Sequence, residues 1–460
     1  MNAIGAIMTI LACAAVIGLP RRKAALAFIA ATLYITQGQV VNLGLNIMAI
    51  RFVEVAAFIR VLARGELFKI SFNTVDRWMI VASCTMAAVF CFREGTIDAY
   101  QIGLAVDANL AYFAFRTFIA DSEDFTFLMK GTAFLLVPLA LLTMVEANTG
   151  RNLFSLLGGV PEESVFREEH YRAQGAFRIS ITAGSLGATY APLFVGFFFL
   201  KSYRKWAAIG VISSIIILLA SHSSGPLMAL MAGVASWACW KYRRKMRLVR
   251  WGIVASLFAL HLMMNKPVWW IFDRLSDYIG GDGWHRSNLI DKWLRDFSIW
   301  AFDGMDFLLT ADWAATQMPW GGVDVTNYFI STALNGGLIS LVFLIVFLTK
   351  VFSKTGQAAA LLRNAGPEFT LDEALIWSAG SAVCAHVVNQ TAVVYWDQFY
   401  VIWYAHLAIA ISLSVHAIKS HSARLNDPYI MDSESVGTTD PQPPAEAPQD
   451  STFLPQKSSI

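Results

Sequence analysis

Charged residues are scarce in this sequence: Asp, Glu, Lys and Arg make up 15% of its 460 residues, against about 25% in ordinary soluble domains. Hydrophobic residues make up 56%. Such a chain cannot cover its apolar surface with polar side chains in water, so the composition excludes an ordinary soluble enzyme and predicts a polytopic membrane protein. The net charge of +2 carries little information, because the distribution of charge matters more than its sum. We expect no nucleic-acid partner.

The sequence is also poor in cysteine, and its few cysteines show no metal-ligand spacing. All of them lie inside apolar runs, at Cys13, Cys84, Cys91, Cys239 and Cys384. We interpret them as small apolar packing residues and expect neither a metal nor a cofactor.

No lysine or arginine precedes the first apolar run, residues 3–18, whereas the cluster Arg21-Arg22-Lys23 follows it. A cleaved signal peptide has its positive charge first. We therefore interpret this run as a first membrane helix with its N-terminus outside.

Long apolar runs are abundant. A spanning helix needs about 17–25 mostly apolar residues, and several runs approach that length, so we expect an all-α bundle of about 12 or 13 spans. The candidate spans are 2–18, 24–38, 44–63, 77–92, 98–118, 126–145, 183–200, 206–220, 226–240, 251–264, 327–349, 372–389 and 397–417.

Basic residues fix the expected orientation, because they concentrate in short cytoplasmic loops. All the basic clusters fall on one side of these spans: 21–23, 60–77, 201–205, 241–250 and 350–363. We therefore expect a cytoplasmic C-terminus in a bacterial inner membrane, with two long periplasmic loops. The expected segments are 1–145, 183–264 and 327–418 for the transmembrane helices, 146–182 and 265–326 for the loops, and 419–460 for a disordered tail.

Both long loops mix aromatic and charged residues. Indole faces stack on sugar rings while charged groups bond sugar hydroxyls, so Trp284 is a candidate glycan contact. Arg172 and Arg178 lie in the first loop and Arg286 in the second. A guanidinium binds phosphate bidentately, so arginines from two loops could clamp a diphosphate. The alternative is an interfacial belt of aromatics with arginines that reach lipid headgroups.

Three patterns follow one another between residues 170 and 350. Arg178 precedes small residues that continue to Pro192; Arg286 begins an Arg-x-x-aliphatic stretch; and Thr326-Asn327-Tyr328 opens a helix that continues through Gly336-Gly337. If 284–293 is helical, Arg286 shares a face with Leu289, Ile290 and Trp293.

In these patterns the chain resembles the bacterial O-antigen ligase and polysaccharide polymerase superfamily. Within that superfamily it most resembles, in character, the exopolysaccharide polymerases. The resemblance implies a metal-independent glycosyltransferase that moves a glycan from an undecaprenyl-diphosphate carrier to an acceptor hydroxyl. The expected partners are the lipid-linked oligosaccharide, membrane lipids, and a chain-length regulator and flippase of the same pathway. Asn327 and Tyr328 would orient sugar hydroxyls.

Two positions depart from the family pattern. The family histidine is Thr326 here, and a family arginine is missing from Ser223-Ser224-Gly225. A neutral histidine or a carboxylate can accept a proton from a sugar hydroxyl. Asp324 and His285 are therefore the candidate bases, ahead of weaker choices in the first loop, which are Glu168, Glu169 and His170.

Three functions stay open: a polymerase, a ligase of the same superfamily, and a flippase or exporter of lipid-linked glycan. The last would place polar residues along a path through the membrane. Arg51 and Glu54, three residues apart in one span, could pair. The other polar residues inside spans are Asp107, His261, His386, Asp397 and His406.

Overall fold

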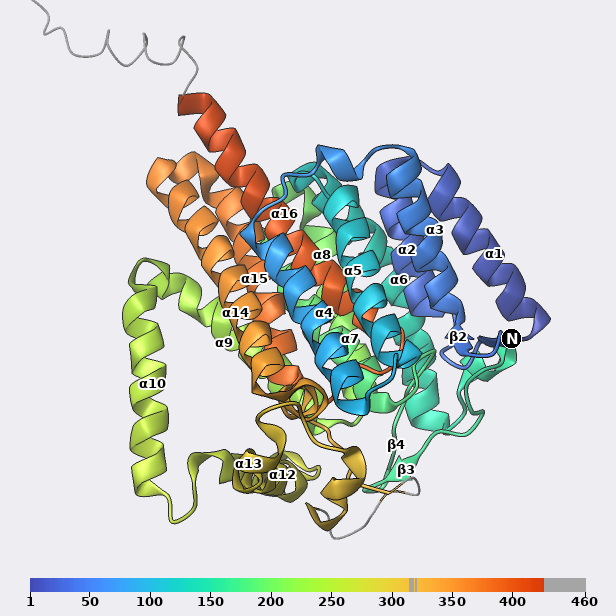
Figure 1. Cartoon of the computed structure of the whole chain (residues 1–460). Coiled ribbons are helices and arrows are strands. Elements are labelled where there is room, and N and C mark those ends of the chain that lie inside the picture. Colours follow the sequence, from blue (N-terminus) through green and yellow to red (C-terminus); the bar gives the residue numbers. More distant parts are fainter. Residues whose placement is uncertain (314–317, 319–320, 426–460) are drawn as a thin grey trace, which may run out of the picture. The chain divides into compact units, whose positions relative to one another are not determined.

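The computed structural model describes residues 1–313, 318 and 321–425. Over these residues the chain is almost entirely α-helical (Figure 1). The first helices are α1 (Ala3–Gly18), α2 (Arg21–Tyr34), α3 (Ala49–Ala63), α4 (Thr74–Glu94), α5 (Ala99–Phe118) and α6 (Ser122–Thr149). The middle helices are α7 (Ser180–Val195), α8 (Arg204–Ala220), α9 (Ser224–Ala238) and α10 (Met246–Met263). The remaining helices are α11 (Ile271–Ile279), α12 (Gly283–Arg295), α13 (Phe297–Trp300), α14 (Tyr328–Ala365), α15 (Thr370–Asn389) and α16 (Phe399–Leu425).

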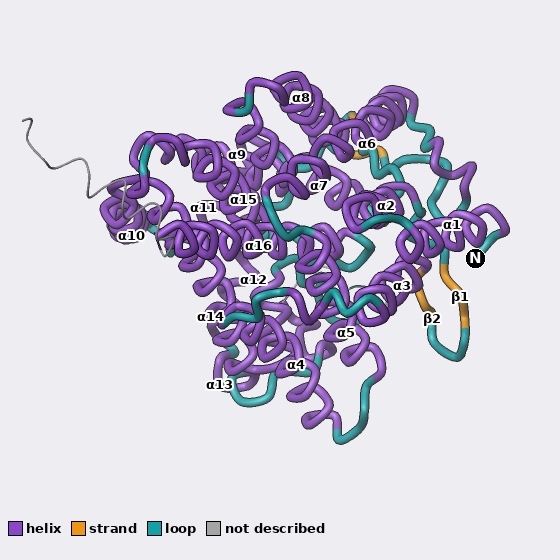
Figure 2. Tube along the Cα trace, turned by 90° about the horizontal axis from the view of Figure 1, so that it is seen from above, coloured by secondary structure: helices purple, strands orange, loops and turns teal. Residues whose placement is uncertain are grey.

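Strands are confined to two short antiparallel pairs in the described part of the chain (Figure 2). One pair is β1 (Val40–Asn42) with β2 (Asn46–Met48), and the other is β3 (Phe166–Arg167) with β4 (His170–Tyr171). The all-α prediction is therefore confirmed.

Each predicted apolar segment overlaps a helix, although residues 35–38 and 44–48 of the predicted spans are not helical. Seven helical stretches in the described residues are long and apolar enough to cross a membrane. The count is below the predicted 12 or 13 because several helices are short or charged, and because α9 and α10 lie within one counted stretch, Ser224–Met263. α1 has 16 residues, α2 has 14 and α3 has 15, and α5 carries Asp107 and Arg116.

Residues Met1–Ile418 form one compact unit. Helix α7 with its continuation, and helix α16, lie at its centre. In the most apolar window of each, 83% and 78% of the residues are buried, respectively. Small residues let α7 pack closely: a Cβ added at Gly187 would lie only 2.1 Å from the Ser214 carbonyl oxygen of α8. The second unit begins at Lys419 and is described only through Leu425, the end of α16. Most of the predicted tail, 426–460, lies outside the described residues.

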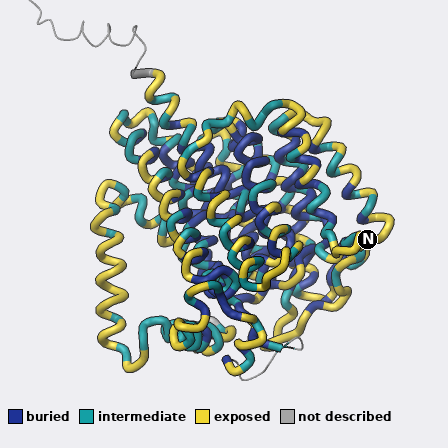
Figure 3. Tube along the Cα trace, in the orientation of Figure 1, coloured by how far each residue is buried: buried dark blue, intermediate teal, exposed yellow. Residues whose placement is uncertain are grey.

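Helix α10 lies apart from the other helices of this unit (Figures 1 and 3). None of its residues is buried. Its exposed large apolar side chains are Leu248, Trp251, Ile253, Val254, Leu257, Phe258, Leu262 and Met263. A helix that is apolar all round and has no protein cover fits a lipid environment and not water.

The two predicted long loops lie at the same end of the bundle, which we call the loop end. It includes the β3–β4 hairpin and helices α11, α12 and α13 (Figure 1). The second loop has its own small core, in which Leu289, Trp300 and Trp313 are fully or almost fully buried. This loop is therefore a folded, largely helical layer.

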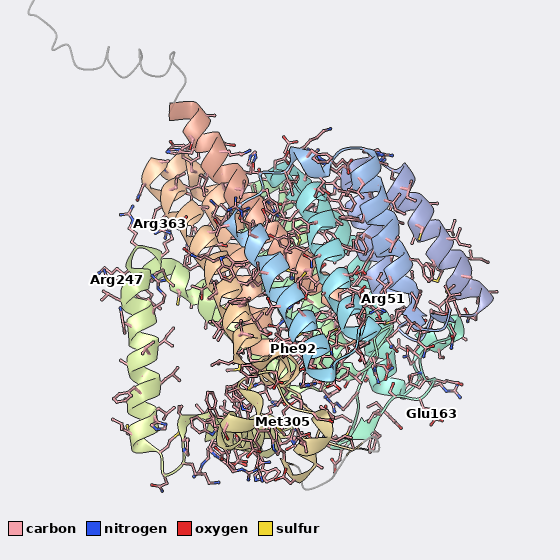
Figure 4. The ribbon with its side chains drawn as sticks, viewed as in Figure 1. Arg51, Phe92, Glu163, Arg247, Met305 and Arg363 are labelled. Carbon is pink, nitrogen blue, oxygen red and sulfur yellow. The ribbon has the colours of Figure 1, made fainter. Side chains whose placement is uncertain are left out.

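The opposite end of the bundle carries the basic helix junctions. Arg247 and Arg363 lie at that end, whereas Glu163 and Met305 lie at the loop end (Figure 4). Ion pairs join the helices there: Arg363 and Glu373 lie 2.7 Å apart. The basic clusters 241–250 and 350–363 thus share one end of the fold.

Gly337 interrupts α14 where the helix meets the second loop. Its φ of 65° and ψ of −172° suit only glycine, and a Cβ there would lie 2.4 Å from the Phe302 carbonyl oxygen. We expect Gly337→Ala to destabilise the fold by about 3 kcal/mol, from strain and overpacking together. Thermal unfolding in detergent would show this as a clear fall in Tm.

Gly356, in the same helix, is the control for this substitution. A Cβ there meets nothing within 4 Å. Because alanine favours a regular helix, we expect Gly356→Ala to leave Tm unchanged or to raise it slightly. An equal fall in Tm for both variants would contradict the assignment of strain to Gly337.

Candidate functional site

A cavity of about 690 Å³ lies at the loop end, between the two predicted loops. The β3–β4 hairpin, the turn between α8 and α9, the start of α12 and the segment before α14 all contribute to its wall. Five of the predicted site residues line it: Arg172, Trp284, His285, Arg286 and Asp324. Residues far apart in the sequence therefore meet in one cavity.

Arg286 is positioned by α12, an amphipathic helix with one buried face. Asp282 caps the helix by accepting a hydrogen bond from the backbone of His285 at 3.0 Å. One turn beyond Arg286, Leu289 is fully buried in the core of the second loop, so α12 is fixed with Arg286 on the cavity. The stretch 284–293 is helical, so the condition under which Arg286 shares a face with Leu289, Ile290 and Trp293 is met.

The guanidinium of Arg286 has no acidic partner at ion-pair distance among the described residues. Burial lowers the pKa of Arg286, and the nearby Asp282 opposes this shift. The side chain nevertheless stays protonated, since arginine does not lose its proton in proteins. A partly desolvated cation without a counter-ion is costly, so this cavity favours an anionic ligand.

Arg172 supplies a second cation to the same cavity. Its Nη2 donates to Ser223 Oγ at 2.6 Å, so a neutral hydroxyl and not a carboxylate is its nearest partner. Burial lowers the pKa of Arg172, Arg167 lowers it further, and Glu168 opposes the shift. Arg172 therefore shares with Arg286 the need for a negative ligand.

The N-terminus of α9 also faces this cavity, through Ser223, Ser224 and Gly225. The side chain of its N-cap residue, Ser223, makes no capping hydrogen bond. Free backbone N–H groups and the helix dipole attract anions. A Cβ added at Gly225 would lie 3.5 Å from Nη2 of Arg286, so the guanidinium packs against this helix end. Two arginines and a helix terminus thus lie together on one surface whose charge suits an anion.

His285 and Asp324 form the polar wall opposite the start of α9. Nε2 of His285 lies 2.8 Å from the carbonyl oxygen of Asp324. A carbonyl can only accept, so Nε2 carries the proton and Nδ1 keeps a lone pair. Burial raises the pKa of the Asp324 carboxyl, and His285 opposes the shift. Each of the two side chains has a basic atom for a proton from a substrate hydroxyl.

Two stacked histidines complete the wall. The rings of His170 and His222 lie 4.3 Å apart and are nearly parallel. His222 adopts a φ of 43°, which is unusual for a residue other than glycine. Burial lowers the pKa of His222, as do His170 and Arg172. His222 was not among the predicted site residues, because its only local signal is a histidine among serines just before a helix.

Three predicted site residues lie elsewhere. Arg178 is exposed and is not part of this cavity wall; its backbone N–H donates to Asp397 at 2.9 Å. Asn327 caps α14 through hydrogen bonds to the backbone of Phe329 and Ile330. Tyr328 lines a second cavity. The expected pairing of Arg178 with Arg286 is therefore replaced by Arg172 with Arg286.

Most polar residues inside the predicted spans have internal partners. Arg51 forms an ion pair at 2.7 Å with Asp107 of α5, so the suggested pairing with Glu54 is corrected. His386 bonds both His406 and Tyr395, each at 2.9 Å. Such pairing favours a structural role over a path through the membrane.

The comparisons with known proteins give no assignment. No family model matches the chain. No curated protein matches it either. The resemblance to O-antigen ligases and polysaccharide polymerases therefore stays a prediction.

Proposed function

We propose that the protein is a membrane glycosyltransferase that joins undecaprenyl-diphosphate-linked oligosaccharide repeat units into a polysaccharide at the periplasmic face of a bacterial inner membrane. One observation carries this proposal: Arg172 and Arg286, which form no ion pair with any described residue, share a cavity with a helix N-terminus, His285 and Asp324. A diphosphate leaving group needs fixed positive charge, and a sugar hydroxyl needs a nearby base.

The chemistry follows from these groups. The acceptor hydroxyl oxygen attacks the anomeric carbon of the donor sugar, and the bond from that carbon to the diphosphate oxygen breaks. The electron pair of this bond stays on the diphosphate, where Arg172 and Arg286 stabilise it. The hydroxyl proton passes to Asp324 or to Nδ1 of His285. Trp284, 45% exposed beside these groups, offers an indole face for the donor glycan.

The proposed orientation places the loop end in the periplasm and the basic end in the cytoplasm, because positive charge is retained on the cytoplasmic side. We expect Glu163→Cys, in an otherwise cysteine-free chain, to react with a membrane-impermeant maleimide in spheroplasts. Arg247→Cys, at the opposite end (Figure 4), is expected to react only after the membrane is permeabilised. The reverse labelling pattern would overturn the orientation.

Deletion of the gene, followed by analysis of lipid-linked sugars, tests the proposed activity. We expect single repeat units to accumulate on carrier lipid at the periplasmic face. Long lipid-linked chains would instead identify a ligase of the same superfamily. Single units held at the cytoplasmic face would identify a flippase and would contradict the proposal.

A further inference from the structure

A second cavity, of about 460 Å³, lies between α3, α4, α5, α14 and the segment that leads into α16. Loop residues Met305, Asp306 and Phe307 form part of its wall, so it reaches the loop end. About a third of its lining residues are aromatic: Phe90, Tyr100, Phe307, Tyr328, Phe347, Tyr395, Trp396, Tyr400, Trp403 and Tyr404. The proposed transfer reaction does not use this cavity for its donor.

Polar side chains also line this cavity, between the aromatic rings. Gln101 is 6% exposed, and its Oε1 has no hydrogen-bond partner in the described structure. Its Nε2 donates to Asn335 Oδ1 at 3.3 Å. A buried amide oxygen without a partner is costly, so a ligand with a hydroxyl or amide donor is favoured here over a hydrocarbon chain.

Most charged side chains in this lining form ion pairs: Arg93 pairs with Glu94 at 2.9 Å, and only Asp306 has no ion-pair partner among the described residues. Arg51 and Asp107 both line it and form an ion pair at 2.7 Å. The cavity therefore differs from the arginine-lined one, where the cations lack acidic partners. Aromatic faces, an unpartnered amide oxygen and paired charges together fit an uncharged sugar, whose apolar face stacks and whose hydroxyls bond.

The two cavities are neighbours that are separated, at two places, by a single stretch of backbone. In the irregular segment before α14, Asp324 and Thr326 line the first cavity, while Val325 lines the second. The loop before α16 also lies between the two cavities, because Ala392 lines the first cavity and Val394 lines the second. A sugar in the second cavity would thus lie beside the segment that carries Asp324.

We propose that this second cavity binds the acceptor glycan, with Gln101 accepting a hydrogen bond from a sugar hydroxyl and Trp396 stacking on a ring. The inference rests on the proposed transferase function. It assigns the donor diphosphate and the acceptor sugar to separate cavities that flank the same segment, 323–326.

Purified full-length protein in nanodiscs tests this assignment. The donor is the lipid-linked repeat unit, and the added acceptor is the oligosaccharide released from it by mild acid. Two products are measured: the extended glycan, and the free oligosaccharide formed when water replaces the acceptor. For Trp396→Ala and Gln101→Leu we expect the KM for acceptor to rise at least 10-fold, with transfer of the donor to water unchanged.

Trp251→Ala is the matched control, because Trp251 is an exposed tryptophan of α10, remote in the fold from this cavity lining; its acceptor KM is expected to stay at the wild-type value. Trp396 is itself 48% exposed, so its loss is compatible with folding, and unchanged Tm verifies this. Normal acceptor KM in both cavity variants would overturn the acceptor site alone. Failure of the wild-type protein to cleave any donor would overturn the transferase function itself.

Discussion

Arg286→Gln is expected to lower glycan transfer by about 10²–10³-fold, the loss found when one preorganised charge-stabilising group is removed. The guanidinium is held at the cavity by the buried face of α12 and has no acidic partner at ion-pair distance in the described residues. Its charge is therefore available to the leaving diphosphate. Arg286→Lys should retain part of the activity, because lysine keeps the charge and loses the bidentate geometry. Donor consumption in nanodiscs measures both.

Arg295→Gln on the same helix is the control for this loss. The side chain of Arg295 is 52% exposed and already pairs with Asp296 and Asp312. Exposed pairs contribute little, so we expect wild-type activity and Tm. Equal losses in Arg286→Gln and Arg295→Gln would show that α12 matters for folding and not for chemistry. Wild-type activity in Arg286→Gln would remove the diphosphate site from this cavity.

Helix positions could be predicted from the sequence because they depend on local pattern. The apolar runs overlap helices, Asn327 caps α14, and the amphipathic repeat around Arg286 forms α12 with Leu289 buried. Each of these features depends on residues within a few turns of one another. Local periodicity and capping are therefore sufficient to predict them.

Which residues line the candidate site could not be predicted in the same way. Arg178 precedes α7 and was expected at the diphosphate, yet its backbone is held by Asp397, which lies 219 residues later. Arg172 reaches the cavity through a bond to Ser223, and His222 through stacking on His170 of the hairpin. These contacts depend on how α7, α8 and α9 pack, and nothing near each residue in sequence encodes that packing.

Residues of α12 lie beside the two positions at which the sequence departs from the pattern of the superfamily that it resembles. Ser223-Ser224-Gly225 lacks an arginine, and Arg286 of α12 packs against Gly225. Thr326 occupies the position of a histidine, and His285 of α12 bonds the carbonyl of Asp324, two residues before it. Both contacts are made by neighbouring residues of α12, which places a cation beside Gly225 and an imidazole beside Asp324.

Asp324→Asn is expected to lower transfer by about 10²–10³-fold if the carboxylate takes the acceptor proton. The pH profile identifies the base. Burial raises the pKa of Asp324, which means that the carboxyl holds its proton to a higher pH than an exposed aspartate. The basic form is therefore lost early on acidification, and wild-type activity should fall as pH drops through this raised pKa. In Asp324→Asn this fall in activity at low pH, the acid limb of the pH profile, should disappear.

His285→Gln separates the two candidate bases. Glutamine can still donate to the Asp324 carbonyl and so keep the segment in place, but it has no basic nitrogen. If Asp324 is the base, His285→Gln retains the acid limb with a smaller loss of rate. If the limb persists in Asp324→Asn and vanishes in His285→Gln, Nδ1 of His285 is the proton acceptor. A limb that persists in both variants would place the base outside this pair, with His170 and His222 of the same cavity wall as the next residues to replace.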